Sequence, residues 1–213
     1  MEGIQNEKQA ISVLDKCYNL TLKGLPTFET VEELAQDYMS KYPNNVEKAS
    51  KELVKWQIVK CGTNGFLAGL GGLIALPAIP INVGSVLYVQ LRMIASIAYM
   101  GGYNPSDDAV KSLVYLCLTG SAISDVAKQA GIKIGEKIAE NTIRKKISGE
   151  VMKKINQIVG FKLVTKAGEK GAVNLIKLVP LVGGGVGATF DSVTTKIIAK
   201  NAENVFLKGV IKG

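Results

Sequence analysis

The stretch that decides the fold is residues 61–106, which read CGTNGFLAGLGGLIALPAIPINVGSVLYVQLRMIASIAYMGGYNPS. These 46 residues carry a single charged side chain, Arg92. Glycines crowd the first half, which Pro77 and Pro80 interrupt, whereas the second half, from about Ile81 to Met100, has the composition of one unbroken apolar helix. We therefore expect the rest of the chain to be arranged around an apolar helical hairpin that is broken by glycine and proline.

The glycines of this stretch indicate close helix packing. Small residues spaced four apart allow the backbone of another helix to approach. The glycines to which we assign this role are Gly65, Gly69, Gly71 and Gly72. A phosphate-binding P-loop would need a Gly-Lys-Ser/Thr sequence followed by a helix, but the chain lacks that sequence and has Pro77 and Pro80 instead. Nucleotide binding is therefore not expected.

Residues 61–106 are compatible with two locations, the core of the protein or the interior of a membrane. Residues 62–76 are shorter than the roughly 20 apolar residues that span a bilayer. Arg92, near the middle of the following helix, would cost about 2.5–3.5 kcal/mol inside a membrane. Polar residues recur on one stripe of that helix, as on a helix that lines the inside of a bundle: Asn82, Ser85, Arg92 and Ser96. A buried core helix and a hairpin that enters the membrane both remain open.

Residues 175–206 repeat this arrangement loosely. They read LIKLVPLVGGGVGATFDSVTTKIIAKNAENVF, which is an apolar segment, a proline, a glycine cluster and a helix. The glycines expected to pack closely here are Gly183, Gly184, Gly185 and Gly187. We expect the two broken hairpins to pack together as a pseudo-repeat.

Arg92 is the one charged side chain of residues 61–106, and Asp191 is the one charged side chain of residues 178–195, which favours a buried polar cluster. An unpaired buried charge is costly, so we expect Arg92 to pair with Asp191 or with Asp125. The candidate members of the cluster are Arg92, Asp125, Asp191, Asn82, Thr194 and Thr195.

The first part of the chain has the pattern of amphipathic helices. Apolar residues recur at helical spacing over residues 3–24, Thr27 or Thr30 can cap a second helix, and a third helix is expected over about 46–61. We predict an all-α protein with an amphipathic N-terminal helical preface at 1–45. The remaining residues, 46–213, are expected to form a single helical domain built around the two broken hairpins.

The net charge of +8 is concentrated in the C-terminal half. Residues 128–170 hold eleven basic and four acidic side chains. The candidates for a membrane-facing surface are Lys133, Lys137, Arg144, Lys145, Lys146, Lys153 and Lys154. These residues either form a solvated face of a packed helix or bind an anionic membrane surface or a membrane protein. Nucleic acid is not expected as a partner, because the chain has only two arginines and few aromatic residues.

The composition limits the chemistry. The chain has no histidine, which is the commonest general base and metal ligand, and its three cysteines are isolated from one another. We expect no metal, no cofactor and no catalytic residues. The first residues lack the basic and apolar regions of a signal peptide, so we expect a cytoplasmic location.

Three functions remain open. The first is a non-enzymatic protein that associates with the membrane or with a membrane or secretion partner. The second is an intracellular binder of an apolar ligand, such as a lipid or acyl chain, held between the broken hairpins. The third is a hydrolase-type enzyme without histidine, whose groups would come from the polar cluster.

Three segments together resemble the EcsC family of bacterial proteins. They are NGFLAGLGGLIALPAIPINVGSVLYVQLRMIASIAYMGGYNPSDD, LVYLCLTGSAISDVAKQAGIKIG and LVPLVGGGVGATFDSVTTKIIAKNA. The resemblance runs from about Glu52 to the C-terminus. It implies a largely helical protein, a cytoplasmic location and association with the inner face of the membrane, and it implies no reaction.

Overall fold

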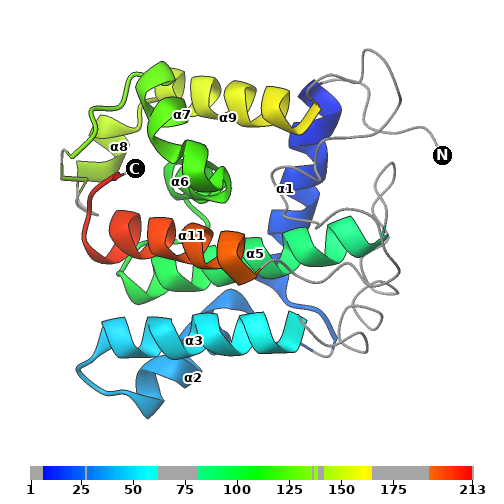
Figure 1. Cartoon of the computed structure of the whole chain (residues 1–213), viewed down its shortest axis with the longest axis vertical. Coiled ribbons are helices and arrows are strands. Elements are labelled where there is room, and N and C mark those ends of the chain that lie inside the picture. The colour runs from blue at the N-terminus through cyan, green and yellow to red at the C-terminus, as the bar shows by residue number, and fades with distance from the viewer. Residues whose placement is uncertain are drawn as a thin grey trace.

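Helix α5 (Ile81–Met100) runs through the middle of the molecule, and most of the other helices pack against it (Figure 1). The computed structural model describes residues 7–26, 28–61, 81–135, 137–138, 142–164 and 192–212. From residue 84 to residue 100, every position of α5 is buried except Tyr99, which is half-buried. The predicted apolar helix is therefore confirmed as the central element of an all-α, single-domain fold.

The C-terminal end of α5 depends on a glycine. A Cβ atom added to Gly101 would lie 2.1 Å from the carbonyl oxygen of Phe206, so only glycine allows the C-terminal segment to approach this closely. The next residue, Gly102, has a φ of +85°, which closes the helix with a left-handed residue. This close approach brings Phe206 edge-on against Tyr103, with ring centroids 5.2 Å apart.

The first three helices belong to the same core as α5. Helix α1 (Glu7–Lys23) packs against α5, and its buried Tyr18 donates a hydrogen bond to the carbonyl of Pro105 at 2.7 Å. Helix α2 (Val31–Lys41) is capped by Thr30 and Glu33 in a reciprocal capping box. It packs against α5 and against α3 (Val46–Cys61). The division predicted at 45/46 thus falls between two helices that contact each other.

The second half of the chain supplies the other side of the bundle. Helix α6 (Asp108–Leu118) is capped by Asp107, whose side chain accepts a hydrogen bond from the backbone N–H of Ala109. A 3-10 turn (Gly120–Ala122) and α7 (Ile123–Gln129) follow, then the short α8 (Ile143–Lys146) and α9 (Gly149–Val164). The chain ends in α11 (Ser192–Ala202) and a wide turn, Glu203–Leu207.

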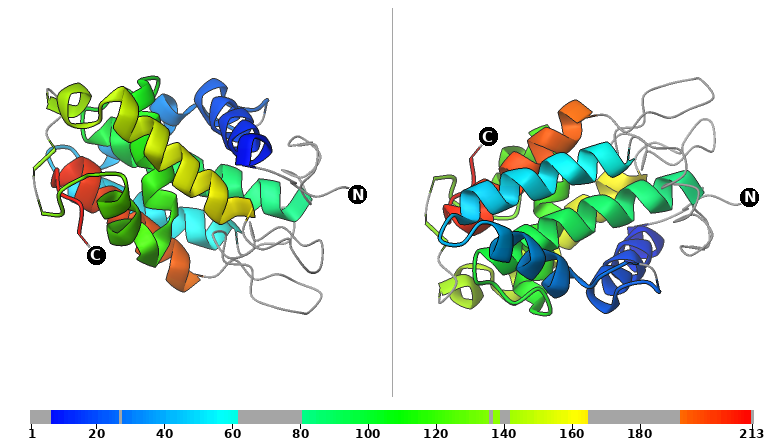
Figure 2. Two further views of the ribbon diagram at one scale, coloured as in Figure 1. Left: turned by 90° about the horizontal axis from the view of Figure 1, so that it is seen from above. Right: turned by 90° about the horizontal axis from the view of Figure 1, so that it is seen from below.

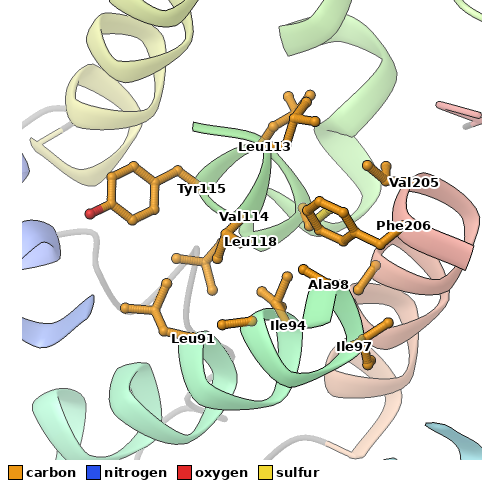
Figure 3. Close-up of a cluster of buried hydrophobic side chains, with 14 of the residues drawn as sticks. Leu91, Ile94, Ile97, Ala98, Leu113, Val114, Tyr115, Leu118, Val205 and Phe206 are labelled. Atoms are coloured by element: carbon orange, nitrogen blue, oxygen red, sulfur yellow. The ribbon is translucent and has the colours of Figure 1, made fainter. Parts of the chain in front are cut away.

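Aliphatic side chains from α5, α6 and the C-terminal turn meet in the interior (Figure 3). Leu91, Ile94 and Ala98 of α5 face Val114 and Leu118 of α6, and all five are fully buried. Burying one such leucine or isoleucine stabilises the fold by about 1.5–3 kcal/mol. The core is therefore built from Ile, Val, Leu and Ala with a few aromatic residues, as the low aromatic content indicates.

The two glycine- and proline-rich segments lie outside the described residues. This applies to every glycine assigned to close packing: Gly65, Gly69, Gly71, Gly72, Gly183, Gly184, Gly185 and Gly187. The helices that follow these segments, α5 and α11, do contact each other, as expected for paired hairpins. The pairing of the segments themselves stays a prediction.

Within the described ranges, no single helix is long and apolar enough to cross a bilayer. By length and composition alone, one bent pair meets that requirement: Asp108–Leu118 with Gly120–Gln129, at an angle of 115°.

Candidate functional site

The buried charge of Arg92 is neutralised by a residue that the sequence did not indicate. Its side chain is 3% exposed, and Nη2 donates hydrogen bonds to the carbonyl of Glu29 at 2.7 Å and to Oε2 of Glu29 at 3.0 Å. The guanidinium also lies over the ring of Phe28, 5.8 Å from its centroid. Arg92 thus links the segment that connects α1 and α2 to the central helix, α5.

The predicted pairing of Arg92 with Asp125 is wrong. Asp125 lies on α7 and is exposed, so it is not part of a buried cluster. Asp191 and the side chains of Asn82 and Thr194 lie outside the described residues. An enzyme built on Arg92 and Asp125 therefore has no assembled site.

The structure places other polar side chains in the interior. Thr195 of α11 is fully buried, as predicted, and so are Gln57 of α3 and Gln90 of α5, which sequence reasoning missed. Their side-chain amide and hydroxyl atoms have no hydrogen-bond partner in the described part of the chain. The three helices contact one another. For Gln90, the sequence did contain a signal of burial, because this glutamine lies within the apolar run of residues 81–100.

The apolar-ligand hypothesis stays a prediction, because the broken hairpins expected to enclose the ligand lie outside the described residues. In the residues that are described, no set of three Cys, Asp or Glu side chains lies close enough to hold a metal ion. Burial raises the pKa of the thiols of Cys17 and Cys117, which keeps both protonated and unreactive at neutral pH.

The basic residues predicted to face a membrane lie on α8, on α9 and on the segment that precedes α8. Helices α8 and α9 lie at the upper end of Figure 1, and α2 and α3 lie at the lower end. The two views along this axis in Figure 2 show α9 nearest the viewer in one and α3 in the other. We call the exposed surface of α8, α9 and the segment that precedes α8 the basic face.

Most of the lysines predicted for a membrane-facing surface are exposed on the basic face. The exposed ones are Lys133, Lys137, Lys145, Lys153 and Lys154. Lys146 is half-buried, and the side chain of Arg144 lies outside the described residues. Among the described residues, none of the five exposed lysines forms an ion pair. The basic face therefore carries positive charge that is not neutralised within the described structure.

An aromatic side chain accompanies these lysines. Phe161 of α9 is 64% exposed, which is unusual for a phenylalanine. It lies seven residues after Lys154 and four after Gln157, so the three side chains project from one stripe of the helix. An exposed aromatic ring beside lysines is typical of helices that lie at a membrane interface.

Residues of α1 and α9, which pack against each other, line a groove of about 520 Å³. Its lining includes three lysines and three carboxamides: Lys8, Lys16, Asn19, Lys153, Asn156 and Gln157. Sequence reasoning missed the contribution of α1, because periodicity along one helix does not show which other helix it contacts.

One acid, Asp15, lines the same groove, and two side chains of α6 contact its carboxylate. The hydroxyl of Tyr115 donates a hydrogen bond to Oδ1 of Asp15 at 2.8 Å, and Nζ of Lys111 lies 3.6 Å from the same oxygen. Burial opposes the charge of Lys111, but its contacts with Asp108 and Asp15 raise the pKa of Lys111 overall. Asp15 is therefore already partnered, whereas the three lysines of the groove form no ion pair with the residues that the structure describes.

The arrangement suits the binding of anions. Lysine ammonium groups and carboxamides are donors for phosphate and carboxylate oxygens, and the groove and the basic face present both.

Comparison with curated proteins and with solved structures finds no match to the chain. The model of one family, described as the EcsC protein family, matches residues 4–208. The resemblance expected from about Glu52 thus extends through α1 and α2, in agreement with their place in the common core. The chain belongs to the EcsC protein family.

Proposed function

We propose that this protein is a non-enzymatic, peripheral membrane protein that binds the anionic lipid surface of the inner membrane through its basic face. The observation that carries the proposal is the set of five exposed lysines that form no ion pair among the described residues, together with the exposed Phe161 on the same end of the molecule.

The expected energies are sufficient for reversible binding. Each lysine near an anionic membrane contributes about 1 kcal/mol, and that contribution decreases when salt screens the surface. A phenylalanine side chain transferred fully from water to an apolar environment contributes about 1.5–3 kcal/mol. Four or five lysines and a partly inserted Phe161 together would give a micromolar to millimolar affinity after the cost of association.

Co-sedimentation with lipid vesicles tests the proposal. We expect the protein to sediment with vesicles that contain an anionic lipid at low salt and not with neutral phosphatidylcholine vesicles. Bound protein should be released as the salt concentration increases. Absence of binding to anionic vesicles at low salt, with protein that circular dichroism shows to be helical, would contradict the proposal.

A further inference from the structure

The groove between α1 and α9 provides a more specific contact than charge alone. We propose that it binds the headgroup of an anionic phospholipid whose headgroup carries free hydroxyls, as in phosphatidylglycerol. This inference rests on the proposed function, since it identifies the lipid that the basic face recognises.

The positions of the lysines support a phosphate contact. Lys8 and Lys16 lie eight residues apart, on one stripe of α1, and Lys153 comes from the opposite wall, on α9. All three are exposed, and no ion pair engages them in the described part of the chain. A phosphate placed between the two helices can therefore approach cations from both sides.

The carboxamides support a headgroup with hydroxyls. Oδ1 of Asn156 is buried and has no hydrogen-bond donor among the described residues, although Asn156 lines the groove. A buried acceptor without a donor is costly, and rotation of the Asn156 side chain toward the groove would let a headgroup hydroxyl supply the missing hydrogen. Asn19 and Gln157 lie in the same lining and offer further amide donors and acceptors.

Contacts with α6 weaken the repulsion between the carboxylate of Asp15 and a bound phosphate. Its carboxylate accepts from the Tyr115 hydroxyl and lies near the ammonium of Lys111. Counting only the charged residues that line the groove, three cations face one partnered anion. The charge of the groove therefore complements a phosphodiester.

The test compares two vesicle types of equal charge and size. Both contain phosphatidylcholine with the same fraction of an anionic lipid, which is phosphatidylglycerol in one and phosphatidylserine in the other. We expect binding to phosphatidylglycerol vesicles to be about 10-fold tighter, the effect of one or two additional hydrogen bonds. Equal affinity for the two vesicle types would overturn the headgroup assignment while leaving the proposed function intact, whereas absence of binding to both would overturn both.

Two double variants with the same change in charge locate the contact. Lys16→Gln/Lys153→Gln changes the groove, and Lys145→Gln/Lys154→Gln changes the basic face outside it. We expect the groove variant to lose the preference for phosphatidylglycerol, and the control variant to bind both vesicle types more weakly with the preference unchanged. An unchanged preference in the groove variant would overturn the assignment.

A third variant separates hydrogen bonding from charge. Asn156→Ala should reduce the preference for phosphatidylglycerol by several-fold while leaving binding to phosphatidylserine vesicles unchanged. Binding of soluble glycerol phosphate as tight as binding to the vesicles would assign the groove to a free phosphate ester and overturn the lipid assignment. Circular dichroism of each variant checks that the fold is retained.

Discussion

The two ends of the molecule are built from similar amphipathic helices but carry charge in different ways. Residues 31–61, which form the α2–α3 end, hold five basic and five acidic side chains. Residues 142–164, in α8 and α9, hold six basic side chains and one acid, Glu150. Ion pairs link Lys41 to Asp37 and Lys55 to Glu52 at the first end.

Each end also exposes one aromatic ring. Trp56 of α3 is 49% exposed, and Phe161 of α9 is 64% exposed. The two ends thus share an exposed aromatic ring and differ in net charge. The comparison indicates that apolar periodicity decides where a helix packs, whereas the sign and pairing of the exposed charges decide what its outer surface can bind.

Reversing the charge of three lysines should give the largest difference in vesicle affinity between the two ends. Lys133→Glu/Lys145→Glu/Lys154→Glu removes three attractions of about 1 kcal/mol each and adds repulsion, so we expect affinity for anionic vesicles to decrease more than about 100-fold. The matched control, Lys48→Glu/Lys51→Glu/Lys55→Glu, changes the same charge at the α3 end and should alter affinity less than about threefold. Equal losses in vesicle co-sedimentation would show that only net charge matters.

Loss of the Arg92 contact should affect stability without affecting the basic face. Arg92→Ala removes two charge-assisted hydrogen bonds to Glu29 and leaves a cavity beside α5, so we expect the free energy of unfolding to decrease by about 2–3 kcal/mol. Urea unfolding measures this change. Vesicle affinity at a temperature where the variant is folded should stay at the wild-type value; a parallel decrease would mean that the two ends are not independent.

The exposed aromatic rings should differ in function despite their similar exposure. Phe161→Ala should weaken vesicle binding by about 10-fold, because roughly half of the apolar contribution of a phenylalanine would be lost. Trp56→Ala should leave vesicle affinity unchanged. If Trp56→Ala weakens binding and Phe161→Ala does not, the membrane contact lies at the α3 end.

The surface ion pairs of the α2–α3 end should contribute least. Lys41 and Asp37 are 57% and 42% exposed, so solvent screens their 2.6 Å contact. We expect Asp37→Ala to change the free energy of unfolding by less than about 1 kcal/mol in thermal or urea unfolding. A larger loss would mean that this end depends on its ion pairs for stability.

Local patterns in the sequence predicted the helices well. The apolar run from Ile81 to Met100 is α5 at those bounds, and the lysines of 145–154 are mostly on an exposed surface. These features depend on periodicity and charge within one segment, which a single sequence displays.

The contacts between distant segments were not predictable in the same way. Arg92 and Glu29 are 63 residues apart, and no local pattern connects an acid in a connecting segment with an arginine in a central helix. Similarly, the groove combines lysines of α1 with Lys153 of α9, and its existence depends on the packing of these two helices. For Asp125 a local pattern was misleading. This residue ends an apolar segment in the sequence, which favoured its burial, yet it lies on the surface.

Trp56 is the only tryptophan, so fluorescence can report which end of the molecule contacts lipid. The measurement compares the wild-type protein with a Trp56→Phe/Phe161→Trp variant, each titrated with vesicles that contain an anionic lipid and a brominated quencher lipid. The membrane-binding account predicts a blue shift and quenching for tryptophan at position 161, and neither for Trp56. Quenching of Trp56 with no change at position 161 would contradict the account.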